Sequence, residues 1–400
     1  MDKQTLMVHK TFKYKLLPTD EQEQKLAFVL RRCRELYNAA LQERRDAWQK
    51  CHKSITCAHQ STELPGIKDV RPEYHDVHSQ ALQEVLTRLD RAFQAFFRRV
   101  QAGEQPGYPR LQGAHRYQSF TYKQFGNGAA LEEGLLVLSK IGRIAVKWSR
   151  PLEGIVKTVT ITHEADGWYV GFSCMDVPTE PLPLTGQETG IDVGVKVFLI
   201  TAQGNVVENP RHYRRAERDL QKAQRRVARR KKGSKRRKKA AQVLAKKHQK
   251  VRRQRQDFHH KTALDLVRRY DVIYLEDLHI ANMSKRPAPQ PDGRGGHQPN
   301  GASRKAGLNK SIQDAGWAQF RTVLEGKAAY AGRRVVAVPP AYTSQDCSGC
   351  GERVEKSLSV RTHVCTSCGL ILDRDENAAR NIQRAGQALQ GAVALAAVSN

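Results

Sequence analysis

The hydrophobic pattern of the first hundred residues predicts one strand followed by two long helices. Over residues 10–17, apolar and polar side chains alternate, which is typical of a strand with one buried face. Thr19, with Gln22 three positions later, has the pattern of a capping box and predicts the start of a helix. Apolar residues then recur with the 3.6-residue period of a helix in two segments, 26–41 and 82–100. We expect both stripes to face a core, so any function should lie on the polar faces.

Residues 118–175 have a different pattern, in which short apolar segments are separated by turn residues. The segments 141–148, 158–162 and 168–172 are strand candidates because β-branched and aromatic residues alternate with polar ones. The expected product is a small β-barrel, a fold that often binds oligonucleotides but implies no function by itself. The Pro-rich segment 178–187 is expected to be a linker.

The second half of the chain is predicted to alternate strands and helices. Its expected elements, in order, are a buried strand at 189–200, a helical hairpin at 211–260, a strand at 270–278, a helix capped by Ser311, a strand at 334–338 and a helix at 376–389. Residues 285–310 contain four Pro and five Gly, and this composition predicts a mobile loop.

Charge points to a polyanionic partner. The 400 residues carry 68 Lys and Arg against 40 Asp and Glu, a formal net charge of +28. Residues 211–260 hold 22 Lys or Arg and three acids, a net +19, with a break at Gly233 and Ser234. A solvated helix or a disordered basic tail is the alternative, but ordinary solvated faces mix both signs. This hairpin is therefore expected to bind nucleic-acid phosphates.

Two features of the chain bear on where it acts. No apolar run approaches the roughly 18 residues that a membrane span needs, and the N-terminus lacks the pattern of a secretory signal. We therefore expect no membrane partner and a cytoplasmic, nucleoid-associated protein of a prokaryote. The length predicts two to four domains rather than one.

Four of the eight cysteines form two CxxC pairs, separated by 14 residues. Each pair aims two thiolates at one point, so Cys347, Cys350, Cys365 and Cys368 together match the tetrahedral all-cysteine set of a structural Zn²⁺ ion. Because no ligand position is left for water, this zinc should stabilise a fold. A redox dithiol remains the alternative.

Three acids occupy positions where a carboxylate is either disfavoured by its apolar neighbours or could serve a site. Asp192 interrupts an apolar strand, Glu276 ends another, and Asp375 lies at a predicted helix start. A buried carboxylate must find a cation or change its pKa, so metal ligation is a simple account. Three carboxylates converging across a sheet could hold two Mg²⁺ ions about 4 Å apart and hydrolyse phosphodiesters. An exposed strand end or a plain helix cap is the alternative for each, above all for Asp375.

Short motifs along the chain form one set. They are KYKLLPT (13–19), AFQAFFRR (92–99), GIDVGVK (190–196), RQDFHHK (255–261), IYLEDL (273–278), SIQDAGWAQF (311–320), YTSQDCSGCG (342–351), CTSCG (365–369) and DRDENAARNI (373–382). Together they resemble the TnpB (OrfB) family of transposon-encoded RNA-guided DNA endonucleases, relatives of type V CRISPR effectors.

The resemblance implies a multidomain α/β architecture with an RNase H-like (RuvC) nuclease domain. The implied domains are a β-barrel wedge domain (1–18 and 108–180), a helical recognition domain (19–107), the nuclease domain (188–342 and 370–400, with the basic hairpin) and an inserted zinc ribbon (343–369). It also implies that Asp192, Glu276 and Asp375 are the catalytic, Mg²⁺-binding triad. Asp375 matches the motif better than Asp373, and strand alternation should turn Asp277 away from the metals.

The implied activity is cleavage of double-stranded DNA directed by a guide RNA from the transposon end. A short target-adjacent motif would be read by Gln80, Gln83 and Thr121, because Gln can pair with adenine and Thr can contact a thymine methyl group. Solvated helix positions are the alternative for the two glutamines. The guide backbone would be bound by the cations of the hairpin, namely Arg229, Arg230, Lys231, Lys232, Lys235, Arg236 and Arg237. A homodimer is left open.

Two other functions compete with this one. A guide-dependent DNA-binding regulator without cleavage would not need the intact acids. A DDE-type transposase typically ends its triad with Glu and has no zinc ribbon before the last acid, so the order Asp, Glu, cysteine pairs, Asp disfavours it. The main departure from the family is the length of 285–310, which would form a lid over the site and could gate it.

Overall fold

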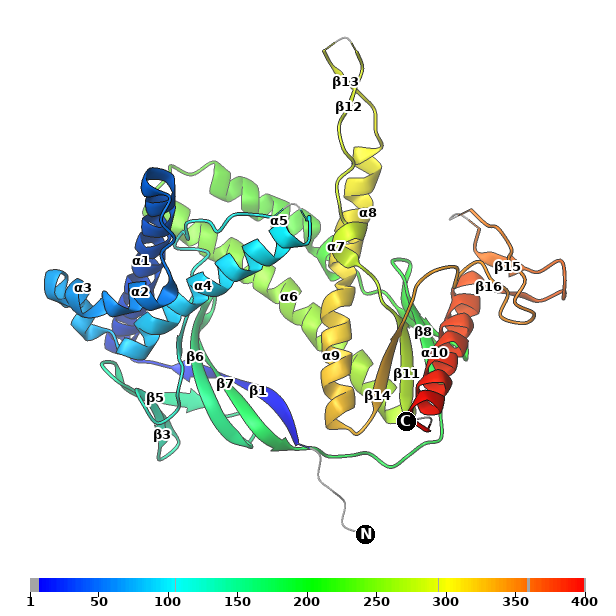
Figure 1. Ribbon diagram of the computed structural model, residues 1–400, viewed down its shortest axis with the longest axis horizontal. Helices are drawn as coiled ribbons and strands as arrows, with labels where there is room; N and C mark the ends of the chain where they lie inside the picture. The colour runs from blue at the N-terminus through cyan, green and yellow to red at the C-terminus, as the bar shows by residue number, and fades with distance from the viewer. Residues whose placement is uncertain (1–6, 105, 294, 358–359, 399–400) are drawn as a thin grey trace. The chain divides into compact units, whose positions relative to one another are not determined.

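The computed structural model describes residues 7–104, 106–293, 295–357 and 360–398 (Figure 1). The chain divides into two compact units, Met1–Pro178 and Thr179–Asn400. Of the helices that these residues form, none has an apolar stretch long enough to cross a membrane.

The first unit contains one seven-stranded antiparallel sheet with the order β2-β6-β7-β1-β5-β4-β3. Its strands are β1 (Met7–Leu17), β2 (Ser119–Tyr122), β3 (Ala129–Glu132), β4 (Leu135–Leu138), β5 (Gly142–Lys147), β6 (Ile155–Glu164) and β7 (Gly167–Pro178). The N-terminal strand thus lies between strands from the middle of the chain. Phe12 of β1 lies opposite Phe172 of β7, and both are fully buried. Within the described residues, β2 and β3 are the two ends of the ladder, so the strand pairing does not close the barrel that we expected.

The described residues of the first unit also form four α-helices and a 3₁₀ turn. They are α1 (Asp20–Cys51), α2 (Cys57–Thr62), α3 (Leu64–Val70), the turn Pro72–Asp76 and α4 (Ser79–Gln101). The predicted capping box is confirmed, because Thr19 and Gln22 exchange side-chain to backbone hydrogen bonds. Leu26 and Leu82, from the two predicted apolar stripes, are both fully buried.

The second unit is built on a five-stranded mixed sheet with the order β10-β9-β8-β11-β14. Its strands are β8 (Glu188–Val193), β9 (Val197–Thr201), β10 (Val206–Glu208), β11 (Val272–Glu276) and β14 (Arg334–Val338). The first three pair antiparallel, whereas β11 is parallel to both β8 and β14. The prediction of one strand over 189–200 was wrong. The chain reverses at Gly194, where an added Cβ would lie 2.9 Å from the Val197 carbonyl oxygen.

The helices of the second unit follow the predicted order with two corrections. They are α5 (His212–Ala228), α6 (Lys235–Arg269), α7 (Ile280–Met283), α8 (Ala302–Ala315), α9 (Trp317–Tyr330) and α10 (Arg374–Val398). The expected loop 285–310 instead contains two short paired strands, β12 (Gln290–Pro291) and β13 (His297–Gln298), and the first half of α8. Ser311 lies inside α8 and caps nothing. The helix starts anew after Gly316, whose φ of +69° interrupts the helical backbone.

Helices cover both faces of this sheet. Ile273 and Leu275 of β11 pack with Leu266 of α6 and Phe320 of α9, whereas Val272 and Tyr274 pack with Ile382 of α10. Helix α10, red in Figure 1, lies close to the strands because glycines remove side chains from the contact. A Cβ on Gly190 would lie 2.1 Å from the Ala379 carbonyl oxygen, and one on Gly386 would lie 1.9 Å from the Tyr274 ring. This close packing therefore holds the polar residues on the α10-covered face of the sheet near the N-terminal end of α10.

Candidate functional site

Strand alternation places two of the predicted acids on the face that α10 covers. Residues 272 and 274 of β11 face α10, so Glu276 continues on the same side. The β8–β11 register pairs Ile191 with Leu275, which makes Asp192 and Glu276 neighbours one position further along. Asp375 lies in the first turn of α10. Three segments far apart in sequence thus bring three carboxylates to one end of the sheet.

The electrostatics of Asp192 show that these acids interact. Burial raises the pKa of Asp192 well above its ordinary value, and the negative charges of Glu276 and Asp375 raise it further. The Arg374 guanidinium partly opposes this rise. Burial also raises the pKa of Glu276, opposed by the hydrogen bond that Thr343 Oγ1 donates to Glu276 Oε1 at 2.5 Å. A buried cluster of this kind favours either a proton or a metal cation.

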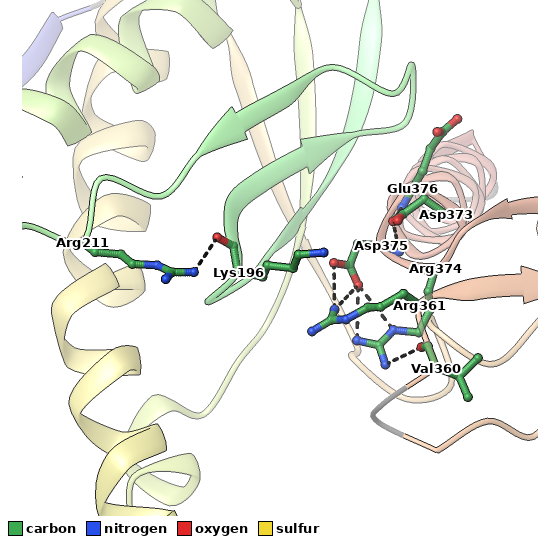
Figure 2. A network of polar contacts seen from close by, with 8 residues as sticks. All are labelled: Lys196, Arg211, Val360, Arg361, Asp373, Arg374, Asp375 and Glu376. Carbon is green, nitrogen blue, oxygen red and sulfur yellow. Dashed lines mark hydrogen bonds and ion pairs between the residues drawn. The ribbon is translucent and has the colours of Figure 1, made fainter. Parts of the chain in front are cut away.

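Asp375 is paired with two arginines (Figure 2). Arg361 Nη1 lies 3.2 Å from Asp375 Oδ2, and Arg374 Nη2 lies 3.3 Å from Asp375 Oδ1. Asp373 has a different task. Its Oδ1 accepts hydrogen bonds from the backbone N–H groups of Asp375 and Glu376, at 2.8 and 3.4 Å, and so caps α10. The helix-cap alternative raised for Asp375 therefore applies to Asp373.

Asp277 lies on the other face of the sheet. Its Oδ1 accepts a hydrogen bond of 2.6 Å from Arg321 of α9, and this pairing lowers the pKa of Asp277. The carboxylate is exposed and directed away from Asp192 and Glu276. Only one acid of the pair at 276–277 is therefore available to the cluster.

The donor set of the cluster suits a hard divalent cation. Carboxylate oxygens are the ligands that Mg²⁺ prefers, and the three acids bring more negative charge than Arg361 and Arg374 neutralise. Among the described residues, two groups of His, Cys, Asp and Glu bring all their ligand atoms within 4.8 Å, and the three carboxylates form neither of them. The three carboxylates thus do not all lie within the reach of one ion in this arrangement.

The four predicted cysteines form one of those two groups, whereas the other joins Glu43, His59 and Glu63 of the first unit. The Sγ atoms of Cys347 and Cys368 lie 3.6 Å apart, as do those of Cys350 and Cys365. An ideal tetrahedron with zinc–sulfur bonds of about 2.3 Å has sulfurs roughly 3.8 Å apart. The arrangement thus fits a tetrahedral zinc ion.

Both cysteine pairs sit in equivalent turns. Cys347 N–H donates to the Glu352 carbonyl oxygen at 2.8 Å, and Cys365 N–H donates to the Leu370 carbonyl oxygen at 2.9 Å. Backbone hydrogen bonds from the second turn lower the pKa of Cys365 to about 6, which favours the thiolate that binds metal. The second turn joins β15 (Thr362–Val364) to β16 (Ile371–Asp373). The strand β16 leads directly into Arg374 and Asp375.

Two asparagines of α10 tie the first cysteine turn to the acidic cluster, a feature that the sequence analysis missed. The Asn377 amide accepts from Ser348 N–H at 2.9 Å and donates to the Asp346 carbonyl oxygen at 2.8 Å. Asn381, one turn later, donates to the carbonyl oxygens of Thr343 and Asp346. Both are buried. Their spacing of four residues within DRDENAARNI was the available signal.

The predicted DNA-reading residues differ in what they contact. Gln80 Oε1 accepts from the backbone N–H of Gln124 at 3.0 Å, and Thr121 Oγ1 lies 2.9 Å from Thr160 Oγ1. Both are thus engaged within the first unit, Gln80 joining α4 to the segment after β2 and Thr121 joining β2 to β6. Gln83 is exposed. Gln83 is therefore the most accessible of the three.

The predicted RNA-binding cations lie on and around the turn between α5 and α6. Six of them are exposed, namely Arg229, Arg230, Lys231, Lys232, Lys235 and Arg236, whereas Arg237 is half-buried. Arg237 Nη1 instead donates to the carbonyl oxygens of Val227 and Arg230, at 3.3 and 3.0 Å. Its guanidinium closes the C-terminal end of α5, which is a structural task.

Comparison with known proteins assigns a family. The OrfB_IS605 family model, described as "Probable transposase", matches residues 172–287, and a Cas12f1-like TNB domain matches 317–382. A protein of Streptomyces pristinaespiralis, named as a candidate RNA-guided DNA endonuclease, is 35% identical over 389 residues that cover 95% of this chain and 90% of that protein. The chain belongs to the TnpB (OrfB) family.

Two further sequence matches agree with this assignment. InsQ of Escherichia coli (strain K12), also named as a candidate RNA-guided DNA endonuclease, is 31% identical over 381 residues, 94% of this chain and 92% of InsQ. A family model described as a helix-turn-helix domain matches residues 7–53, which in this TnpB chain form β1 and α1. The solved structure of the mini-RNA-guided endonuclease CRISPR-Cas_phi3 aligns over 95% of this chain and 92% of its own, at 11% identity and a TM-score of 0.46. The two superpose only loosely, and the family assignment rests on sequence.

Proposed function

We propose that this protein is an RNA-guided DNA endonuclease that hydrolyses DNA phosphodiesters at one Mg²⁺-dependent site. The observation that carries the proposal is the convergence of Asp192, Glu276 and Asp375 from β8, β11 and α10 onto one face of one sheet. Two Mg²⁺ ions bound there would activate a water molecule and stabilise the leaving oxygen. The names of the two full-length relatives support the same activity.

The nuclease domain is proposed to be RNase H-like (RuvC). Three antiparallel strands followed by two parallel ones, with a helix bearing the last acid across the sheet, support this proposal. The proposed domain comprises 188–342 and 370–400, with the zinc ribbon 343–369 inserted. The wedge domain (1–18 and 108–180) and the recognition domain (19–107) complete the proposed organisation.

The residues around the acids have proposed tasks of their own. Thr343 orients Glu276 through its hydroxyl group. Arg361 and Arg374 hold the Asp375 carboxylate, so these contacts must loosen when Asp375 becomes a metal ligand. Once released, an arginine beside the site can bind a DNA phosphate instead.

The nucleic-acid partners are proposed to be a guide RNA from the transposon end and a double-stranded DNA target with an adjacent motif. The exposed cations of the turn between α5 and α6 would bind the RNA backbone, because their density supplies charge without base-reading geometry. Gln83 is the proposed motif-reading residue, since it alone of the three predicted ones is exposed. Replacing Gln83 by Ala should alter the preferred motif, whereas an unchanged motif at unchanged activity would dismiss this residue.

One reconstitution tests the proposed function. The protein is expressed with its native locus, the copurified RNA is sequenced, and a plasmid library carrying the guide-matched target beside randomised flanks is incubated with Mg²⁺. We expect a transposon-end RNA and cleavage of the subset of plasmids that carries one flanking motif. The Asp192→Asn variant should bind the same subset without cutting it. Absence of bound RNA, or equal cleavage by both proteins, would contradict the proposal.

A second function is supported by the ion pairs of Asp375. A carboxylate already neutralised by two arginines suits a protein that binds DNA without cutting it. The same library distinguishes this function. A regulator would retain the motif-bearing plasmids, and the unaltered protein would leave them intact with either Mg²⁺ or Mn²⁺.

A further inference from the structure

We infer that two adjoining cationic cavities of the second unit form one track for a single DNA strand, which leads to the three carboxylates. The identity of the strand rests on the proposed nuclease function. The track itself rests on the lining of the cavities and on the orientation of Lys196.

The first cavity, of about 880 Å³, lies where α5, α6, α8 and the segment before β12 meet. Four cations line it, namely Arg255, Arg286, Lys305 and Lys310. Among the described residues that line it the one acid is Asp314, whose two carboxylate oxygens already accept backbone N–H groups of α5, from Tyr213 at 2.8 Å and Arg214 at 3.1 Å. The lining is therefore strongly positive and suits an anionic ligand.

Two polar atoms of the lining have no hydrogen-bond partner. Arg255 Nε and Asn309 Oδ1 are buried without a hydrogen bond. Tyr213 and Gln313 also line the cavity. Cations for phosphates, an aromatic ring for stacking and amides for base edges are the groups that bind unpaired nucleotides.

The second cavity, of about 460 Å³, meets the first at Asp314, which lines both. Lys196, Arg211 and Arg214 supply its positive charge. Lys310 and Arg214 also contact Glu217, which neutralises part of the charge where the cavities join. The charge that remains is carried by Arg255, Arg286 and Lys305 in the first cavity and by Lys196 and Arg211 in the second.

Lys196 connects the track to the acidic cluster. The turn that carries it is held from the end of β10, because Asn209 Nδ2 donates to the Val195 carbonyl oxygen at 3.0 Å and Arg211 Nη2 donates to the Lys196 carbonyl oxygen at 3.4 Å. Figure 2 shows the Lys196 side chain directed toward Asp375. A strand lying along both cavities would thus deliver a phosphate to Asp375. Because the proposed reaction there cuts DNA, we assign the track to the DNA strand that is cut.

Binding of single-stranded DNA in a buffer without Mg²⁺ and without a chelator tests the track without any cleavage. The probe is a fluorescent oligo-dT of about 20 nucleotides, titrated against the protein as purified at several salt concentrations. Lys196→Gln and Arg286→Gln should each weaken binding about threefold and lower the salt slope by about 0.7, the value for one lost single-strand phosphate contact. Lys196→Arg should restore binding. Arg304→Gln is the matched control, since Arg304 is an exposed cation of α8 outside the lining.

The outcomes separate this inference from the proposed function. If Lys196→Gln and Arg286→Gln bind oligo-dT as Arg304→Gln does, the track is wrong even where the protein cleaves DNA. If they weaken an oligo-U probe but not oligo-dT, the cavities serve RNA and the inference also fails. If they weaken oligo-dT binding in a protein that never cleaves, the track stands as a DNA-binding surface and the nuclease function fails.

Discussion

Asp373 and Asp375 stand two residues apart, and the first accepts a hydrogen bond of 2.8 Å from the backbone N–H of the second. Asp373 thereby begins α10, whereas the Asp375 side chain is left to face the cluster and its arginines. The two carboxylates of one motif therefore stabilise different things, a helix terminus and a candidate metal site.

This division predicts opposite outcomes for two substitutions. Asp375→Asn should abolish cleavage and leave the melting temperature nearly unchanged, because it removes a ligand but keeps the cap. Asp373→Ala should cost about 1 kcal/mol of stability through the lost cap and retain cleavage. Cleavage rates and thermal unfolding of both variants check this. An essential Asp373 with a dispensable Asp375 would reverse the assignment.

Asn377 is predicted to keep the cysteine cluster in place. Replacing it by Ala leaves Ser348 N–H without its acceptor and the Asp346 carbonyl oxygen with Asn381 as its remaining donor, at a cost of about 1–3 kcal/mol. We expect one zinc per chain in the unaltered protein and faster zinc loss to a chelator in Asn377→Ala. Metal analysis measures both. Gln387→Ala, an exposed position of the same helix, is the control and should lose zinc at the unaltered rate.

Gly386 is predicted to be intolerant of any side chain. In Gly386→Ala the new Cβ would meet the Tyr274 ring at 1.9 Å, so α10 must move away from the sheet and carry Asp375 with it. We expect a loss of about 1–3 kcal/mol, or more, and a large drop in cleavage rate. Gly391→Ala, in the same helix with open space around it, should instead add up to about 1 kcal/mol. Chemical denaturation compares the two, and equal effects would refute the close packing.

The basic hairpin is predicted to contain two kinds of cation. Changing Arg229, Arg230, Lys231 and Lys232 together to Gln should weaken RNA binding and flatten its salt dependence by up to about 0.7–0.9 for each lost phosphate contact. Arg237→Gln should mainly lower stability, because its guanidinium bonds the end of α5. Salt titrations of RNA affinity separate the two variants. A weaker affinity of the fourfold variant at an unchanged slope would mean that it acts through folding.

His259 is predicted to make the second unit sensitive to acid. Its ring is buried against Phe198 and Phe320, Nε2 donates to the Ala315 carbonyl oxygen at 2.8 Å, and Nδ1 has no partner. Burial, together with the charges of Arg255 and the neighbouring histidines, lowers the pKa of His259 to about 4, although the hydrogen bond to Ala315 opposes this shift.

In the unfolded chain the same histidine titrates near 6.5. The unfolded state therefore binds the proton first, and the stability that His259 contributes above about pH 6.5 is lost as the pH falls toward 4, by roughly 2–3 kcal/mol. Urea unfolding at several pH values should show a smaller loss in His259→Gln than in the unaltered protein. Identical pH profiles would show that this histidine is not the group responsible.

The local elements and the chemistry of the site were accessible from the sequence, because they depend on neighbouring residues. Periodicity located α1, α4 and most strands, the Thr19 and Gln22 pair located a helix start, and two CxxC turns predicted a tetrahedral ligand set. Asp192 and Glu276 were found because a carboxylate within or at the end of an apolar strand is costly unless something binds it.

Tertiary structure alone decided which groups meet. The reversal at Gly194, the helix inside 285–310 and the open sheet of the first unit depend on long-range pairing, which local propensity does not encode. The local sequence also could not predict that Arg361, Arg374 and Lys196 lie beside Asp375, because a cation has the same local pattern whatever side chain it faces. Side-chain partners follow from packing across the sheet, where Gly190 and Gly386 let α10 approach closely enough to bring Asp375 to Asp192 and Glu276.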